Sequence, residues 1–264
     1  MIVREMSDGR LLCINQTSHA LLSEALCRHW GNHEFARPQP YDVVMTAIGQ
    51  HDNGWHQWES APKLRADGYP MDFIHEDDPL GKVDLWRRGV AQSYDQHPYS
   101  ALLIGRHAAL LYEKYLDNNE PDVRREISVF TAEQAKLLVQ MRTDFSQTSF
   151  YTAALDDQCI DANCRLLQFG DRASLQLGIP WEKTCSISLC PVDGKGEFTT
   201  ITMQWEQTGR RGHVSFDPWP YSVDRFEVDI HGRLLSQRLF ENVADYHMAL
   251  KSAPYQRLTW SVEK

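Results

Sequence analysis

The sequence has little that would place it in a membrane or on a nucleic acid. No stretch of about 18 residues is free of charged side chains, which speaks against a membrane-spanning helix. There is no block of like charges, and 36 Asp and Glu residues outnumber 27 Lys and Arg residues. We therefore expect neither a nucleic-acid polymer nor an anionic membrane as a partner.

Cysteines and export features are also sparse. The six cysteines are scattered in apolar surroundings. The first residues carry charges from Arg4 onward and lack the apolar stretch of about 7–15 residues that an export signal needs. We therefore expect reduced, mostly buried thiols and a cytoplasmic protein. No Gly-x-Ser-x-Gly elbow is present, so covalent catalysis by a serine has no support.

The composition is that of a folded chain with a large core. Hydrophobic residues make up 42% and aromatic residues 11% of the 264 residues, which argues against disorder. At about 100–200 residues per domain, this length predicts one large domain, or one domain with a smaller appendage. The 11 histidines are unusual because several fall where a helix should be apolar.

The first two-thirds of the sequence follow a helical spacing of apolar residues. A short hairpin is expected at 2–14, and a long loop at 59–81, rich in Pro, Gly and Asp, is of the kind that often lines a site. The expected helices lie at 18–30, 41–52, 83–94, 99–116, 123–142 and 157–178.

From Thr184 onward the pattern changes to short runs of alternating residues, separated by turn residues at 193–196, Gly209 and His231-Gly232. This pattern is typical of antiparallel β-structure. The sequence therefore predicts a mainly α fold. A helical domain at 1–180 would be followed by a small antiparallel β appendage at 181–264, which the hairpin at 2–14 would join.

Four of the expected helices each place an ionisable side chain on the face that should be buried. His19 is in line with Leu22 and Leu26, and His107 is flanked by leucines on the same face. The complete set on such faces is His19, His51, Asp52, His107 and Asp171.

A single buried histidine has an ordinary explanation, a core imidazole bonded to a carbonyl. Three histidines and two aspartates are harder to explain in this way, because a buried carboxylate is costly unless it is paired or bound to a metal. A divalent ion satisfies both residue types, since neutral imidazole and carboxylate are its natural ligands. The spacing therefore favours a metal site.

The order of His19, His51-Asp52 and Asp171 resembles the H…HD…D pattern of the HD superfamily of metal-dependent phosphohydrolases. More closely, the chain resembles the DUF3891 family, a domain of unknown function. The matching stretches are Gln16-Thr17-Ser18-His19-Ala20, Gln50-His51-Asp52-Asn53-Gly54-Trp55 with Trp58-Glu59, and 98–107, which begins Pro98-Tyr99-Ser100 and ends Arg106-His107.

The resemblance implies an HD-type helical bundle in which His19, His51, Asp52 and Asp171 surround one divalent ion. HD proteins with two metals use further histidines between the doublet and the last aspartate. The candidates here are His56, His97 and His107, of which His107 ranks first because its helix face is apolar. The ion would be Mn, Fe, Ni, Co or Zn, and a second ion stays open.

Together with the resemblance, these residues suggest a metal-dependent hydrolase of HD type that acts on a small phosphorylated substrate through a metal-bound hydroxide. Asp52 would orient the attacking water, and His107 would bind a second ion or donate a hydrogen bond to the substrate. Two alternatives stay open, an HD-type di-iron oxygenase and a non-catalytic metal-binding or regulatory module. A homo-oligomer also stays open. Arginines that would serve a phosphate are Arg87, Arg88, Arg106 and Arg172.

Overall fold

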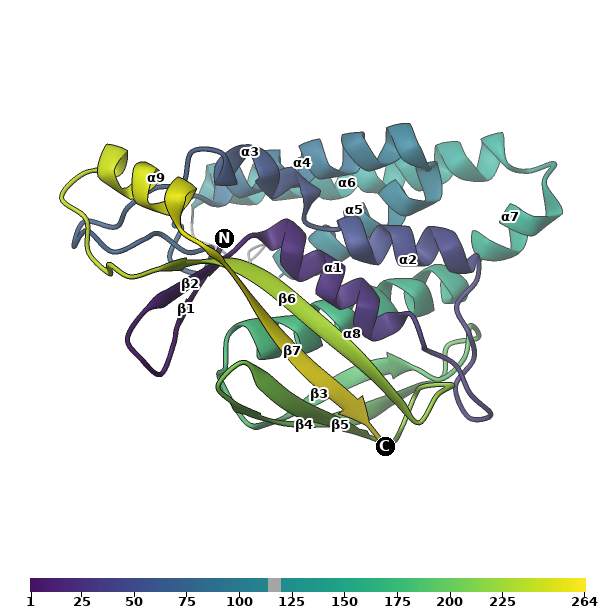
Figure 1. Cartoon of the computed structure of the whole chain (residues 1–264). Helices are drawn as coiled ribbons and strands as arrows, with labels where there is room; N and C mark the ends of the chain where they lie inside the picture. Colours follow the sequence, from purple (N-terminus) through teal and green to yellow (C-terminus); the bar gives the residue numbers. More distant parts are fainter. Residues whose placement is uncertain (114–119) are drawn as a thin grey trace.

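The computed structural model describes residues 1–113 and 120–264, which form layers of helices over one curved sheet (Figure 1). The described helices are α1 (Gln16–Cys27), α2 (Tyr41–Gln50), the 3-10 turn η1 (Asn53–Trp55), α3 (His56–Glu59), α4 (Pro79–Gln96), α5 (Pro98–Tyr112), α6 (Pro121–Asp144), α7 (Ser149–Ala154), α8 (Asp157–Gly178) and α9 (Val243–Ser252). The described strands are β1 (Ile2–Glu5), β2 (Leu11–Ile14), β3 (Thr184–Pro191), β4 (Phe198–Thr208), β5 (Arg211–Asp217), β6 (Arg225–Leu235) and β7 (Tyr255–Glu263).

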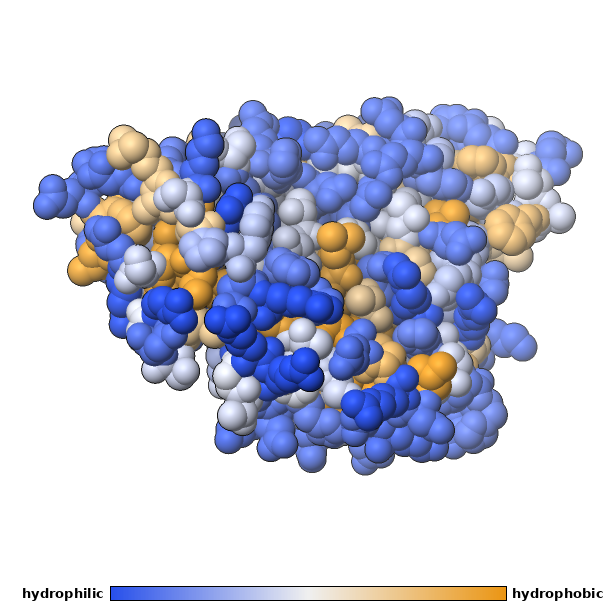
Figure 2. All heavy atoms as spheres, in the orientation of Figure 1, coloured by the Kyte–Doolittle hydropathy of each residue, from blue (hydrophilic) through white to orange (hydrophobic). Residues whose placement is uncertain are grey.

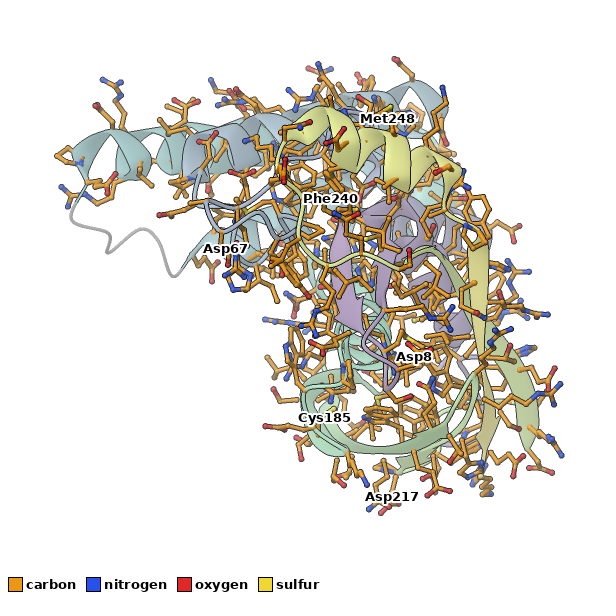
Figure 3. The ribbon with its side chains drawn as sticks, turned by 60° about the vertical axis from the view of Figure 1, so that its left-hand side comes forward. Asp8, Asp67, Cys185, Asp217, Phe240 and Met248 are labelled. Atoms are coloured by element: carbon orange, nitrogen blue, oxygen red, sulfur yellow. The ribbon has the colours of Figure 1, made fainter. Side chains whose placement is uncertain are left out.

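These strands join into one sheet with the order β1-β2-β6-β7-β5-β4-β3. Neighbouring strands pair antiparallel, except that β5 and β7 pair parallel. The hairpin expected at 2–14 is present, and it joins the sheet because β2 pairs with β6. Figure 3 shows its turn at Asp8, with Cys185 and Asp217 at the part of the sheet farthest from Met248 of α9.

The expectation of a mainly α, HD-type bundle with a small antiparallel sheet is wrong. Helices make up 48% and strands 22% of the structure, so the fold is mixed α and β. The seven strands of the described residues curl into a half-barrel that supports the helices. The division at residues 180 and 181 stays a prediction, although strands from both sides of it share this sheet.

Gly232 explains part of this error. The residues His231-Gly232 are typical of a turn, yet β6 continues through both of them to Leu235. A Cβ at Gly232 would lie 2.7 Å from the carbonyl oxygen of Cys13 in β2 and 2.9 Å from the side chain of Ile14. Glycine is therefore required here because β2 approaches closely. In the sequence, such a glycine is easily taken for a turn residue.

The helices form two layers over the sheet. α1 packs against β6 and α8 against β3, while α4 and α6 pack on α5 farther from the sheet (Figure 1). Leu22 and Leu26 of α1 share one hydrophobic cluster with Ile230 of β6 and Trp260 of β7. The sheet thereby fixes α1 and α8, the helices that carry His19 and Asp171.

The predicted helices differ from the observed ones mainly at their ends. α8 spans Asp157–Gly178 as predicted, and α4 and α6 begin earlier than predicted because a proline starts each of them. Residues 114–116 of the helix expected at 99–116 lie outside the described residues. No helix in the described part of the chain is long and apolar enough to cross a membrane.

Candidate metal centre

His51 and Asp52 lie where α2 ends. The helix stops at Gln50, and the chain turns through Asp52 into η1. Adjacent residues within a helix point about 100° apart, so an unbroken helix would separate the two side chains. The turn lets both face the same centre, as the sequence analysis required.

Two glycines beside the site let the helices approach each other closely. Gly54 follows the His-Asp doublet, and a Cβ there would overlap the carbonyl group of Leu85 in α4. Gly170 precedes Asp171, and a Cβ there would lie 2.9 Å from the carbonyl oxygen of Ser23 in α1. α4 therefore packs directly on the η1 turn, and α8 packs directly on α1.

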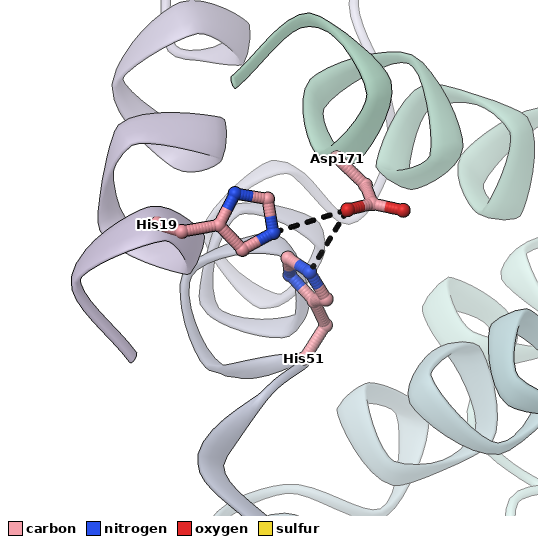
Figure 4. Close-up of side chains that lie close together, drawn as sticks. All are labelled: His19, His51 and Asp171. Atoms are coloured by element: carbon pink, nitrogen blue, oxygen red, sulfur yellow. Dashed lines mark ion pairs between the residues drawn. The ribbon is translucent and has the colours of Figure 1, made fainter. Parts of the chain in front are cut away.

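This packing brings His19, His51 and Asp171 together (Figure 4). Nε2 of His19 lies 3.0 Å from Oδ1 of Asp171 and 3.5 Å from Oδ2 of Asp52, and Nε2 of His51 lies 3.6 Å from each of these oxygens. One donor atom each from His19, His51 and Asp171 lie within 4.8 Å of one another. Two ligand atoms that each lie about 2.0–2.2 Å from a shared ion can be up to about 4.4 Å apart. A small movement of these side chains would therefore let all three bind one ion.

The second ring nitrogen of both histidines is already hydrogen-bonded. Nδ1 of His51 lies 2.7 Å from the carbonyl oxygen of Ile48, which only accepts, so this nitrogen carries the proton. Nδ1 of His19 lies 2.7 Å from Oγ of Ser174. Ser174 in turn donates to the carbonyl oxygen of Asp171. Bonds of this kind are the ones that orient Nε2 toward a metal.

His107 of α5 lies on the other side of Asp171. Its side chain is 1% exposed, and neither ring nitrogen has a hydrogen-bond partner among the described residues. Its Nε2 lies 3.7 Å from Oδ2 of Asp171, whereas His19 and His51 lie beside Oδ1 of the same carboxylate. Nε2 of His51 likewise has no hydrogen-bond partner in the part of the chain that the structure describes. Unpartnered buried polar atoms are costly, so these nitrogens fit a site for a metal ion.

The electrostatics of the site favour a cation. Burial disfavours the charged form of His51, but the carboxylates of Asp52 and Asp171 outweigh it and raise the pKa of this ring to about 9. Burial raises the pKa of the Asp52 carboxyl and lowers the pKa of His107 to about 3. Burial opposes the ionised form of Asp171, yet the neighbouring imidazole rings of His19 and His51 bring its pKa well below the usual range. Positive charge is therefore stabilised between the two aspartates.

The other candidate histidines do not join this group. His56 is exposed on α3. His97 caps α5, where its Nδ1 accepts a hydrogen bond from the backbone of Tyr99 at 3.1 Å and its Nε2 lies 2.6 Å from the Tyr151 hydroxyl. Of the three histidines between the doublet and Asp171 that the resemblance indicated, the structure places His107 alone at the site.

A pocket of about 300 Å³ opens onto the site. Its most buried lining includes His19, Asp52 and His107, with Asp171 beside them, whereas the buried His51 does not line it. Most of the remaining wall is aromatic or aliphatic, and Gln16 and Lys82 add an amide and an ammonium group. The wall residues are Gln16, Trp55, Phe73, Ile74, Lys82, Trp86, Leu111, Tyr112 and Leu175. Phe73 and Ile74 come from the long loop that the sequence analysis expected to line a site.

Sequence reasoning missed the cation and the amide of this pocket. The arginines singled out earlier do not line it: Arg106 is exposed, and Arg87 pairs with glutamates of α6. Lys82 lies one helical turn before Trp86 on the same face of α4, and Gln16 lies three residues before His19 on the same face of α1. Helical spacing from Trp86 and His19 was the sequence signal that would have indicated Lys82 and Gln16.

The description of the matching family is "Protein of unknown function (DUF3891)", and its model matches residues 1–237. The chain belongs to the DUF3891 family. The DUF3891 match includes every residue of the candidate metal centre and the strands from β1 to β6, and it ends before α9 and β7. No curated protein and no solved structure matches the chain.

Proposed function

We propose that this DUF3891 protein is a metal-dependent hydrolase that acts on a small phosphate ester. The observation that carries the proposal is the group of His19, His51 and Asp171, with Asp52 and His107 beside it, at the buried end of a pocket. The H…HD…D order of these residues, which resembles the HD phosphohydrolases, supports the same reaction class. A pocket that ends at such a group is the usual setting for a small substrate.

His19, His51, Asp52 and Asp171 would hold the ion, because their nitrogen and oxygen donors converge and Nδ1 of both histidines is already bonded. Mixed imidazole and carboxylate ligands suit Mn, Fe, Co, Ni or Zn. When bound, such an ion polarises a phosphoryl oxygen and lowers the pKa of water.

The protein's own residues would then direct the hydrolysis. Asp52 lines the pocket and would orient the attacking water and accept its proton. The water oxygen forms a bond to phosphorus, while the ester P–O bond breaks and its electron pair stays on the leaving oxygen. That oxygen takes up the proton, so the products are an alcohol and inorganic phosphate. His107, neutral in its buried position, would donate a hydrogen bond to the phosphoryl group.

His107 also favours a second candidate function. Its nitrogens, which have no hydrogen-bond partner among the described residues, and the nearby Oδ2 of Asp171 would suit a second ion, which His107 and Asp171 would help to hold. Two irons held in this way would support a di-iron oxygenase. A bound-iron content near two per chain, with an absorption band in air and no esterase activity, would favour that alternative.

The test is metal analysis of the purified protein, followed by a panel of phosphate esters with wild type and Asp52→Ala. We expect bound metal in wild type and release of inorganic phosphate from at least one ester. Asp52→Ala should lower this activity by at least about 100-fold, as loss of a positioned proton acceptor does. A metal-loaded protein that hydrolyses no ester would contradict the proposal.

A further inference from the structure

Gln16 presents an amide to the metal-site pocket that the proposed reaction does not use. It is the first residue of α1 and is 3% exposed, and its backbone N–H donates to Glu59. Its Oε1 is buried and has no hydrogen-bond partner among the described residues, although Gln16 lines the pocket. A buried amide oxygen without a partner costs free energy, which a bound ligand with a hydrogen-bond donor would recover.

The rest of the pocket wall offers aromatic faces and edges. Trp86 packs edge-on against His107, with ring centroids 5.6 Å apart, and Trp55 packs edge-on against Phe73 at 6.4 Å. Both tryptophans are almost fully buried. Leu111, 38% exposed, continues the apolar lining toward solvent. Aromatic walls of this kind bind flat rings well, by offset-stacked or edge-to-face contacts.

The volume of the pocket indicates how large a part of the ligand it can enclose. A cavity of about 150 Å³ holds a molecule the size of benzene. The pocket here, about 300 Å³, therefore has room for one ring and a phosphoryl group. Lys82, on the same face of α4 as Trp86, brings a positive charge to the wall that suits the anionic phosphoryl oxygens.

We infer that the substrate is the phosphate monoester of a single flat ring that carries a hydroxyl group, with Gln16 as the residue that selects for this hydroxyl. The inference rests on the proposed hydrolase function and names its substrate class. A hydroxyl both donates and accepts, so it can pair with the amide of Gln16 in either orientation. A sugar brings several hydroxyls, whereas the wall beyond the metal-site residues is mostly apolar.

The first experiment compares kcat/KM of the metal-loaded enzyme for phenyl phosphate, the hydroxyphenyl phosphates and glycerol phosphate. We expect the aryl esters to exceed glycerol phosphate, and at least one hydroxyphenyl phosphate to exceed phenyl phosphate by about tenfold, the effect of one paired polar group. Equal or better hydrolysis of glycerol phosphate would overturn the inference while the proposed hydrolase function stands.

The second experiment changes the selecting residue. Gln16→Leu should bring the ratio between hydroxyphenyl and phenyl phosphate to about one while phenyl phosphate is still hydrolysed, because the backbone bond to Glu59 does not need the side chain. Gln158→Leu, in the first turn of α8 and exposed, is the matched control and should keep the ratio. An unchanged ratio in Gln16→Leu would overturn the role of Gln16.

If no ester is hydrolysed, the binding of uncleavable phosphonates tests the inferred substrate class separately from the proposed hydrolase function. Phenylphosphonate and the hydroxyphenylphosphonates, which are not cleaved, are titrated calorimetrically into the Mn²⁺-loaded protein and into Gln16→Leu. Tighter binding of a hydroxyphenylphosphonate to wild type, lost in Gln16→Leu, would support the ring pocket even if the hydrolase proposal fails. Absence of binding by every phosphonate would overturn the inference on the substrate.

Discussion

At the scale of single residues, the hydrogen bonds to the candidate ligands matter as much as the ligands, because they set the orientation and tautomer of the rings. The Oγ atoms of Ser23 and Ser174 lie 2.7 Å apart, and Ser23 donates to the carbonyl oxygen of His19. If Ser174 donates to the carbonyl oxygen of Asp171, its Oγ accepts from Nδ1 of His19. Nε2 of His19 then has its lone pair directed at the site, which is the tautomer that a metal needs.

Ser174→Ala should therefore weaken metal binding without removing a ligand. The substitution leaves Nδ1 of His19 without its partner, and losses of such outer bonds cost about 10- to 100-fold in metal affinity. The measurement is a competition titration with a chelating dye. Ser128→Ala is the control, since Ser128 also bonds back to a helical carbonyl but is exposed on α6. Equal affinities of Ser174→Ala and wild type would contradict the role of this bond.

Alanine substitutions of three histidines should lower the metal content of the protein to different extents. His51→Ala should lose most of the bound metal, because this ring faces both aspartates. His107→Ala should retain one ion per chain, because His107 lies beside Oδ2 of Asp171, whereas His19 and His51 lie beside Oδ1. His56→Ala, exposed and four residues from Asp52, should match wild type. Elemental analysis of the three variants checks the order, and a retained full metal content in His51→Ala would be incompatible with the proposed ligands.

Residue-level prediction from the sequence was strong where helical periodicity applies. An ionisable side chain in line with leucines had to face the core, and His19, His51, Asp52 and His107 are buried. Gln16 and Lys82 were missed because a polar residue near a helix end is ordinarily solvated, and their role depends on a pocket that several elements create.

At the scale of elements, the site depends on how closely neighbouring helices approach. Gly89 of α4 lies against Gly54, where a Cβ on Gly89 would be 3.2 Å from the Gly54 nitrogen. Gly170 of α8 likewise allows a close contact with α1, because a Cβ on Gly170 would lie only 2.8 Å from Sγ of Cys27. These contacts hold the His51-Asp52 turn and Asp171 at the distances that the site requires.

Gly170→Ala should accordingly destabilise the protein and displace Asp171 from His19. An added methyl group in a packed helix contact costs about 1–3 kcal/mol. Urea unfolding measures the loss, and metal affinity should fall with it. Gly194→Ala is the control, because an added Cβ there has no atom within 4 Å. A Gly170→Ala protein as stable as Gly194→Ala would show that this close approach is unimportant.

Element prediction succeeded for helices and failed for the extent of the sheet. Helix α8 was found at its full length because its pattern is local and its end is marked by glycine. β6 was cut short at Gly232, since the reason for that glycine lies in β2, more than two hundred residues earlier in the chain. Non-local pairings of this kind leave no periodic signal in one strand.

At the scale of the whole molecule, the half-barrel and the helices stabilise each other through a large shared hydrophobic cluster, and a second cluster lies under α9. Figure 2 shows apolar atoms on the surface around α9, where Leu239, Val243 and Met248 are exposed.

The mainly α prediction failed at this scale because the sequence shows which strands exist but not how they pair. The first strand, β1, is linked to the last, β7, through β2 and β6, an arrangement that no local pattern indicates.

Metal removal should lower the stability of the whole fold, because the site ties together α1, α5, α8 and the end of α2. An ion at about 100 times its dissociation constant adds about 2.7 kcal/mol to the free energy of unfolding. Thermal unfolding with and without a chelator should therefore show a clearly lower Tm in the metal-free protein. The metal-free Asp171→Asn variant serves as control, and its Tm should not respond to added metal.

The most direct test of the central claim is a calorimetric titration of the metal-free protein with Mn²⁺, for wild type and Asp171→Asn. The account predicts one or two ions bound per wild-type chain, and binding at least about 100-fold weaker in Asp171→Asn, whose amide supplies neither the charge nor the second oxygen ligand. Wild-type binding that is absent, or equal to that of Asp171→Asn, would contradict a metal centre formed by His19, His51, Asp52 and Asp171.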